Sequence, residues 1–240
     1  MAPQDIIKKR NKQSNLIRKM VISGMMSAIT AILVFTPIGM VTLPPPLLSV
    51  TTVHVPVILS ALVEGPVVGL IVGAVFGICS FIRSWESGAV GLSIFFRNPL
   101  ISILPRLLVP LVAVGVYMLI KKIFSQSKWS ERVGAVVASI LATITNTVGC
   151  LGMLVIIYGA ELTELINGMI HTGNAEAAYL NNAGAWLVAV VGLPNGIAEA
   201  LVAALVVPMI KTAVEAVLRR SGHKSAVKPP VNKSQSGEKG

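Results

Sequence analysis

The chain is poor in charge, in acids and in aromatic residues. Only 12% of its 240 residues are charged, whereas soluble domains carry about 25%. Glu199 is the only acid well inside an apolar stretch, which leaves no paired carboxylates for acid–base catalysis. The two cysteines, Cys79 and Cys150, provide neither a disulfide framework nor a zinc-ligand spacing. A soluble fold, a metal site and a bound cofactor are therefore not expected.

Motifs for nucleotide hydrolysis and metal catalysis are missing as well. The sequence contains neither G-x-x-x-x-G-K-[ST] nor H-E-x-x-H, so the chain should not hydrolyse ATP by itself or act as a zinc protease. Its three histidines, His54, His171 and His223, lie in different regions. These absences predict a protein that is not an enzyme.

Long apolar stretches are what the chain does have. Hydrophobic residues make up 54% of it, and one crossing of the bilayer core needs about 20 apolar residues. The second of these stretches, residues 50–63, is short enough to be a re-entrant segment or a buried core helix instead of a span. The Glu64-Gly65-Pro66 segment after it predicts a tight turn. We predict an all-α membrane protein with a bundle of six transmembrane helices, over residues 20–40, 50–63, 66–82, 100–120, 133–158 and 185–210.

The basic residues indicate the orientation of this bundle. Seventeen of the 20 lysines and arginines lie before the first stretch, between the fourth and fifth, or after the sixth. The positive-inside rule makes that side cytoplasmic, with both termini on it. Residues 1–17 then form a basic cytoplasmic tail, residues 18–220 the membrane domain, and residues 221–240 a disordered basic tail. The net charge of +10 suits attraction to the lipid bilayer better than binding to nucleic acid.

Polar side chains gather in the predicted external half of the spans. Because they are costly in hydrocarbon, they should face other helices or a water-filled cavity. Two arginines need a counter-charge or a bound anion, whereas the asparagines and threonines can also serve as hydrogen-bonding groups between helices. The candidate substrate-binding residues are Thr51, Thr52, His54, Arg97, Asn98, Arg106, Asn146, Thr147 and Asn195.

Small residues form a second pattern. The first stretch carries small-xxx-small pairs, which let another helix approach closely. The spacing fits packing within the bundle as well as contact with another protein. Glycines 69, 73 and 77 of the third stretch are expected to pack within the bundle. The face on the first stretch consists of Ser23, Gly24, Ser27, Ala28 and Ala31.

Several short segments, taken in order, resemble the substrate-binding (S) component of energy-coupling factor (ECF) vitamin transporters. They are TTVHVPVIL (51–59), EGP (64–66), GAVFG (73–77), PRL (105–107), TNT (145–147) and LPN (193–195). The resemblance covers residues 18–218 and is nearest to the branch that contains the pantothenate and riboflavin components.

This resemblance implies a vitamin-binding subunit in the plasma membrane of a prokaryote. It implies a pocket near the external face, with the loops after spans one, three and five as a lid. It also implies that the small-residue face of span one docks on a transmembrane coupling protein, which carries two ATPase subunits.

Charge and composition favour pantothenate as the vitamin. One arginine can face its carboxylate, while Asn and Thr side chains bind its hydroxyls and amide. A flavin would need flat aromatic walls, and only 5% of the residues are aromatic. Riboflavin or another water-soluble vitamin is the alternative ligand.

Two further alternatives stay open at this point. Trp85, Phe95 and Phe96 could close over a ligand or form an aromatic belt at the membrane interface. The chain could also be a self-sufficient secondary transporter, although the sequence shows no convincing half-to-half repeat.

Overall fold

The computed structural model of the protein describes residues 3–41, 50–86, 91–124, 129–171 and 183–220. Two short strands, β1 (Met40–Val41) and β2 (Val50–Thr51), pair antiparallel ahead of the second helix. The 3-10 segments η1 (Pro37–Gly39) and η2 (Gly91–Arg97) and the π-helix η3 (Leu187–Gly192) each adjoin at least one α-helix in sequence or lie between two helices. Those helices are α1 (Pro3–Phe35), α2 (His54–Glu64), α3 (Pro66–Arg83), α4 (Pro99–Ile123), α5 (Ser130–His171), α7 (Ala183–Trp186) and α8 (Leu193–Arg220).

In the described part of the chain, five helical segments are long and apolar enough to cross a membrane, which confirms the predicted all-α membrane class. The sixth predicted stretch, α2, has 11 residues and therefore rises about 16 Å, roughly half the thickness of the bilayer core. It forms a buried core helix, one of the alternatives left open by the sequence. The five long segments are Lys12–Phe35, Pro66–Arg83, Pro99–Ile123, Ser130–Gly168 and Gly184–Leu218.

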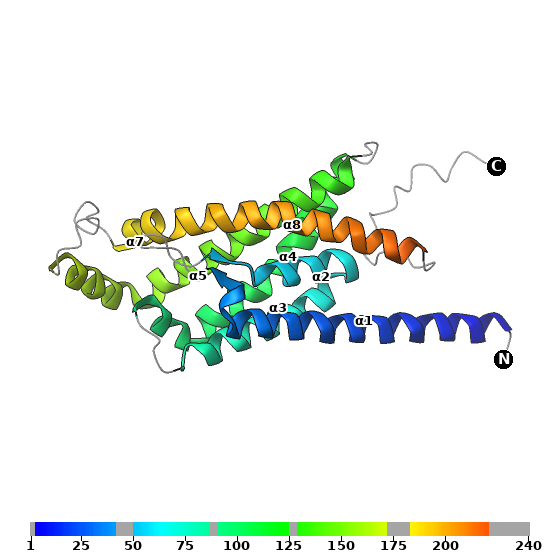
Figure 1. Cartoon of the computed structure of the whole chain (residues 1–240), viewed down its shortest axis with the longest axis horizontal. Coiled ribbons are helices and arrows are strands. Elements are labelled where there is room, and N and C mark those ends of the chain that lie inside the picture. The colour runs from blue at the N-terminus through cyan, green and yellow to red at the C-terminus, as the bar shows by residue number, and fades with distance from the viewer. Residues whose placement is uncertain (1–2, 42–49, 87–90, 125–128, 172–182, 221–240) are drawn as a thin grey trace.

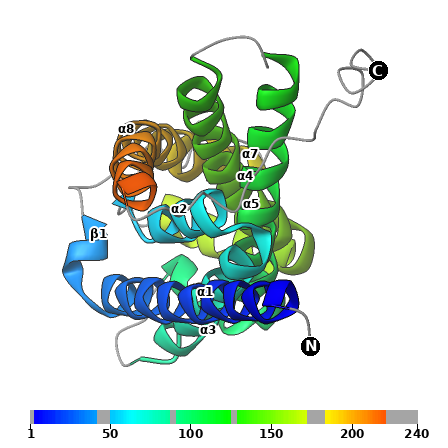
Figure 2. The same ribbon diagram turned by 90° about the vertical axis from the view of Figure 1, so that its right-hand side faces the viewer.

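Helix α2 lies at the centre of the bundle. Figure 2 shows it surrounded by α1, α3, α4, α5 and α8, and every one of its residues is buried. Its sequence explains this position, because a helix that is apolar on all faces is stable only inside a protein or a membrane. At its end, the buried Glu64 carboxylate accepts a hydrogen bond from the Arg18 guanidinium of α1 at 2.8 Å.

The helices run back and forth along one axis (Figure 1). The first residues of α1 and the last residues of α8 lie at the same end of the bundle, which we call the terminal end. The opposite, distal end carries η2, α7 and the last part of α5. Helix α1 begins at Pro3 and so includes most of the segment predicted as a tail, whereas residues 221–240 lie outside the described part.

Glycines allow α3 to pack closely against its neighbours. Gly65 has a φ of 97° and joins α2 to α3, which confirms the predicted tight turn. A Cβ atom at Gly69 would lie 2.5 Å from the Cβ of Ala61, and one at Gly73 would lie 2.6 Å from the carbonyl oxygen of Arg106. The glycines of α3 therefore serve packing inside the bundle, as expected.

Two apolar clusters form the core, and a polar layer separates them. The central cluster includes Val109, Ala142 and Ala203, and the distal cluster includes Ile101, Leu154, Val191 and Trp186. Along α4, α5 and α8, the residues Arg106, Asn146, Cys150 and Glu199 lie between members of the two clusters, and the half-buried Thr51 joins them through its hydrogen bonds to Glu199. We use the name polar layer for Thr51, His54, Arg106, Asn146, Cys150 and Glu199.

Candidate functional site

Two prolines shape α4 around Arg106. A helical carbonyl normally accepts a hydrogen bond from the N–H four residues later, and proline has no N–H. Pro105 therefore frees the carbonyl of Ile101, and Pro110 frees that of Arg106. The Arg106 Nη1 atom donates to the Ile101 oxygen at 2.9 Å. The arginine thus satisfies a carbonyl that its neighbouring proline leaves without a helical donor.

The rest of the Arg106 guanidinium lies among sulfur and aromatic groups. Nη1 also donates to the Cys150 sulfur at 2.6 Å, and the rings of Phe76 and Phe96 lie 5.1 Å from the guanidinium carbon. The residue is only 7% exposed, and its Nε atom is buried without a hydrogen-bond partner. Within the described residues no carboxylate lies within 4.0 Å of it. Arg106 is therefore a buried cation without an ion-pair partner in this part of the chain.

Glu199 of α8 provides the acidic group of the polar layer. One of its carboxylate oxygens accepts hydrogen bonds from the backbone N–H of Thr51 at 2.8 Å and from the Thr51 hydroxyl at 2.6 Å. Glu199 is buried, and it is close enough to Arg106 for their charges to interact. The sequence already singled it out as an isolated acid inside a span, but gave no sign that it would meet Thr51.

His54 opens α2 and is fully buried within the layer. Its ring lies near the backbone of Glu199, yet neither ring nitrogen makes a hydrogen bond of acceptable geometry with a described residue. Buried polar groups are usually hydrogen-bonded, so an exception calls for an explanation. With the Glu199 backbone beside the ring, at least one of its two buried nitrogens is available to a bound molecule.

The segment η2 covers the polar layer on the distal side. Asn98 caps α4 by accepting a hydrogen bond from the Leu100 N–H at 3.0 Å, and its amide donates to the Tyr158 hydroxyl at 3.4 Å. Phe95 packs on the Tyr158 ring with centroids 5.0 Å apart. The chain of α5 is non-helical at Tyr158, where the fifth span was predicted to end. Phe95 and Phe96 of η2 therefore pack inward rather than forming a belt.

The other predicted binding residues lie outside this cluster. Arg97 donates to the Ser84 carbonyl at 3.0 Å, and its guanidinium carbon lies 4.9 Å from the centre of the exposed Trp85 ring. The Thr52 N–H donates to the Gly39 carbonyl at 3.0 Å. The Thr147 hydroxyl donates to the carbonyl oxygen of Thr143 in its own helix at 3.3 Å. The structure thus brings together Thr51, His54, Arg106 and Asn146 from the predicted set.

Asn146 and Asn195 carry the remaining amide groups of the predicted set. Asn146 is buried, and its oxygen lies 3.9 Å from the Cys150 sulfur, which can donate a weak hydrogen bond. The side-chain oxygen of Asn195 is also buried, and it has no hydrogen-bond partner in the described part of the chain. Both amides can therefore still serve a polar ligand.

The five small residues of α1 do not all face the same way: some face the bundle and others face away from it. Ser23 is buried, and Ala31 packs against the central cluster. The hydroxyl oxygens of Ser23 and Ser27 are buried, and neither has a hydrogen-bond partner among the described residues. Gly24 and Ala28 point away from the bundle, and a Cβ atom at Gly24 would meet nothing within 4 Å. Only Gly24 and Ala28 are therefore exposed to a partner.

An apolar groove of about 790 Å³ runs between α5 on one side and α7, η3 and α8 on the other. Thr147 is the only polar side chain among its lining residues, which include Val148, Leu151, Val188 and Ile197. No group of three or more His, Cys, Asp or Glu residues that could hold a metal ion occurs in the described part of the chain.

Comparison with known proteins relates most of the chain to one protein family. The family model described as ECF transporter, substrate-specific component, matches residues 18–211. This stretch contains the whole polar layer and all five long helical segments for most of their length. The search of curated proteins returned no match.

Proposed function

Because the chain belongs to the family of ECF transporter substrate-specific components, we propose that it binds pantothenate, or another small vitamin with a carboxylate, in the polar layer. The family consists of substrate-binding transport subunits rather than enzymes. A coupling protein with two ATPase subunits is the partner that would supply the energy for import.

The buried Arg106 guanidinium carries the proposal of an anionic ligand. A buried charge without a partner is costly, and a carboxylate that accepts hydrogen bonds from an arginine removes most of that cost. Nε of Arg106 is still available as a donor. The hydroxyl and amide groups of such a vitamin match His54 and Glu199, which lie in the same layer.

Phe96 determines how a ligand would reach Arg106. The centre of its ring lies 5.1 Å from the guanidinium carbon. The Ser102 hydroxyl of α4 donates a hydrogen bond to the Phe96 carbonyl oxygen. We expect η2 to move aside so that the carboxylate takes the place of the ring. In this proposal η2 is the described part of the lid that the family resemblance implies, and residues 42–49, 87–90 and 172–182 of the three loops lie outside the described part.

The proposal includes the orientation in the membrane. The buried α2, with the segment that leads to it, would complete a sixth passage through the protein, so that both chain ends face the cytoplasm of a prokaryotic cell. The basic residues near the terminal end support this orientation. The distal end, and with it the lid, would then face outward.

Isothermal titration of purified protein with pantothenate tests the assignment. We expect tight binding, and we expect Arg106→Ala to weaken it by at least about 30-fold, since removal of one partner of a buried charge pair costs about 2–5 kcal/mol. Arg97→Ala, which removes an equal charge outside the polar layer, should change affinity less than about threefold, as usual for a screened surface charge.

Three results would contradict the proposal. Equal losses for both arginine variants would remove the assignment of the anion site to Arg106. Tight riboflavin binding that Arg106→Ala leaves unchanged would exclude a carboxylate ligand. Liposomes that contain this chain alone should not accumulate the vitamin, and uptake in them would indicate a secondary transporter.

A further inference from the structure

A second polar site lies at the terminal end of the bundle, away from the polar layer. A pocket of about 670 Å³ opens between the first turns of α5 and the last turns of α8. Its charged lining residues are Glu131 and Arg132 from α5 and Lys211 and Glu215 from α8. Trp129, just before α5, forms part of its rim and is 63% exposed.

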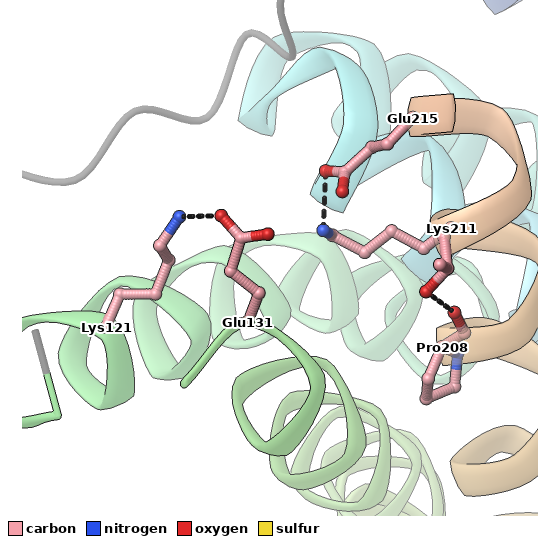
Figure 3. Close-up of polar contacts among 6 residues, drawn as sticks. Lys121, Glu131, Pro208, Lys211 and Glu215 are labelled. Atoms are coloured by element: carbon pink, nitrogen blue, oxygen red, sulfur yellow. Dashed lines mark hydrogen bonds and ion pairs between the residues drawn. The ribbon is translucent and has the colours of Figure 1, made fainter. Parts of the chain in front are cut away.

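Positive and negative groups face each other across this pocket. Figure 3 shows the Glu131 carboxylate and the Lys211 ammonium pointing toward each other from α5 and α8. Glu131 accepts a hydrogen bond from Lys121 at 2.9 Å, and Lys211 donates to Glu215 at 2.6 Å. The gap between the two ion pairs is therefore bordered by both signs of charge.

The two cations of the pocket retain capacity to bind an anion. Lys211 is 3% exposed, and its ammonium makes one carboxylate contact and lies 4.8 Å from the centre of the Tyr117 ring. An ammonium has three donors, so these contacts leave one. Arg132 stacks on Trp129 at 5.7 Å and has no carboxylate within 4.0 Å among the described residues.

The charges that line the pocket indicate which charges its ligand carries. Two acids and two bases line it, with Lys121, the partner of Glu131, outside the lining, so a ligand with one anionic and one cationic group keeps the lining balanced in charge. A phosphate can accept hydrogen bonds from Arg132 and Lys211, whereas a primary ammonium can donate to the carboxylates of Glu131 and Glu215. A quaternary ammonium prefers an aromatic cage, and Trp129 is the only aromatic residue in the lining.

We propose that this pocket binds the headgroup of a phospholipid that carries a primary ammonium, of the phosphatidylethanolamine type. The location supports a lipid source, because tryptophan is enriched at membrane interfaces and the pocket lies where two long apolar helices reach their charged ends. The headgroup would connect the terminal ends of α5 and α8 and stabilise their packing.

Native mass spectrometry of the full chain in detergent tests this site. The protein is mixed with phosphatidylethanolamine, phosphatidylcholine and phosphatidylglycerol that share the same acyl chains. Retention of the ethanolamine lipid should exceed that of the others by about tenfold, the factor expected for one additional charge-assisted hydrogen bond. Arg132→Gln should remove this preference, whereas Lys122→Gln, which removes an equal charge from an exposed side chain outside the pocket, should keep it.

A second variant separates a headgroup site from a loss of folding. Glu215→Gln leaves an acceptor for Lys211 but makes the pocket net positive, so it should shift the preference toward the anionic phosphatidylglycerol. Equal retention of the three lipids by the unchanged protein would overturn the proposal, and so would equal effects of Arg132→Gln and Lys122→Gln. Binding of free phosphoethanolamine as tight as that of the lipid would overturn the lipid source.

Discussion

Arg106 shows how a functional position can be built from its neighbours in sequence. Pro105 and Pro110 each remove a helical N–H, which leaves two carbonyl oxygens without their helical donor. The arginine side chain donates a hydrogen bond to one of them, the carbonyl oxygen of Ile101. The other freed carbonyl belongs to Arg106 itself and faces Gly73 of α3. Its position therefore depends on a proline on either side and on a glycine across the helix interface.

Replacing Gly73 tests this dependence. The Cβ atom of Gly73→Ala would lie 2.6 Å from the Arg106 carbonyl oxygen, which is too close, so α3 and α4 must separate. We expect a loss of about 1–3 kcal/mol in the free energy of unfolding, as for other overpacked cores, and weaker vitamin binding. Denaturant titration and calorimetry on the purified protein would measure the two effects.

Gly115→Ala in α4 is the matched control for that change. A Cβ atom there would meet nothing within 4 Å, so the substitution should be neutral or should stabilise the helix by up to about 1 kcal/mol. If both variants lose stability equally, the contact between Gly73 and Arg106 is not what holds α4 in place.

The polar layer was only partly predictable from sequence. Arg106 and His54 could be identified because a charge or an imidazole is conspicuous in an apolar stretch. Glu199 was noted as an isolated acid but was not assigned to the site, because its partner Thr51 is 148 residues away along the chain. Arg97 and Arg106 looked alike in sequence, and only the packing of η2 separates them.

At the scale of the helices, composition predicted the long spans well and the central helix less well. Continuous apolar stretches with charged ends predicted both ends of α3 and α4 and the start of α5 to within about three residues, whereas α5 and α8 continue past their predicted ends. For α2 the sequence allowed a span or a buried helix, because the length of an apolar run does not reveal what surrounds it. The break at Tyr158 coincides with the predicted end of the fifth stretch, but the sequence did not predict that the helix resumes after it.

Helix α1 allows a prediction about the coupling protein, which rests on the proposed transport function. Ala28 is exposed, whereas Ser27 is half-buried and its hydroxyl oxygen faces the bundle without a partner. Ala28→Leu should therefore spare vitamin binding and abolish co-purification with the coupling complex. Ser27→Leu should instead reduce the stability of the isolated subunit by about 1–3 kcal/mol through overpacking.

The two leucine variants serve as controls for each other, since they add nearly the same bulk one position apart. Co-purification assays and denaturant titrations on both variants would distinguish the two faces of α1. Undiminished co-purification of Ala28→Leu would show that docking uses another surface. Equal stability of the two variants would contradict the inward position of Ser27.

For the molecule as a whole, the two ends of the bundle differ in chemistry. The terminal end carries the ion pairs Arg18–Glu64, Lys121–Glu131 and Lys211–Glu215. The distal end carries the aromatic cover of η2 and the apolar distal cluster. This difference supports the proposal that a vitamin enters at the distal end, beneath η2.

This difference between the two ends leads to a prediction about orientation in the cell. Cysteine is introduced at Glu86, which is exposed near the distal end, or at Lys122, which is exposed at the terminal end. Cys79 and Cys150 are buried, so they should react little with a thiol reagent that cannot cross membranes. Because basic residues favour the cytoplasmic side, intact cells should label Glu86→Cys only, and Lys122→Cys should require permeabilised cells. Labelling of Lys122→Cys alone in intact cells would reverse the orientation and place the lid over Arg106 on the cytoplasmic side, where a subunit for import could not collect its vitamin.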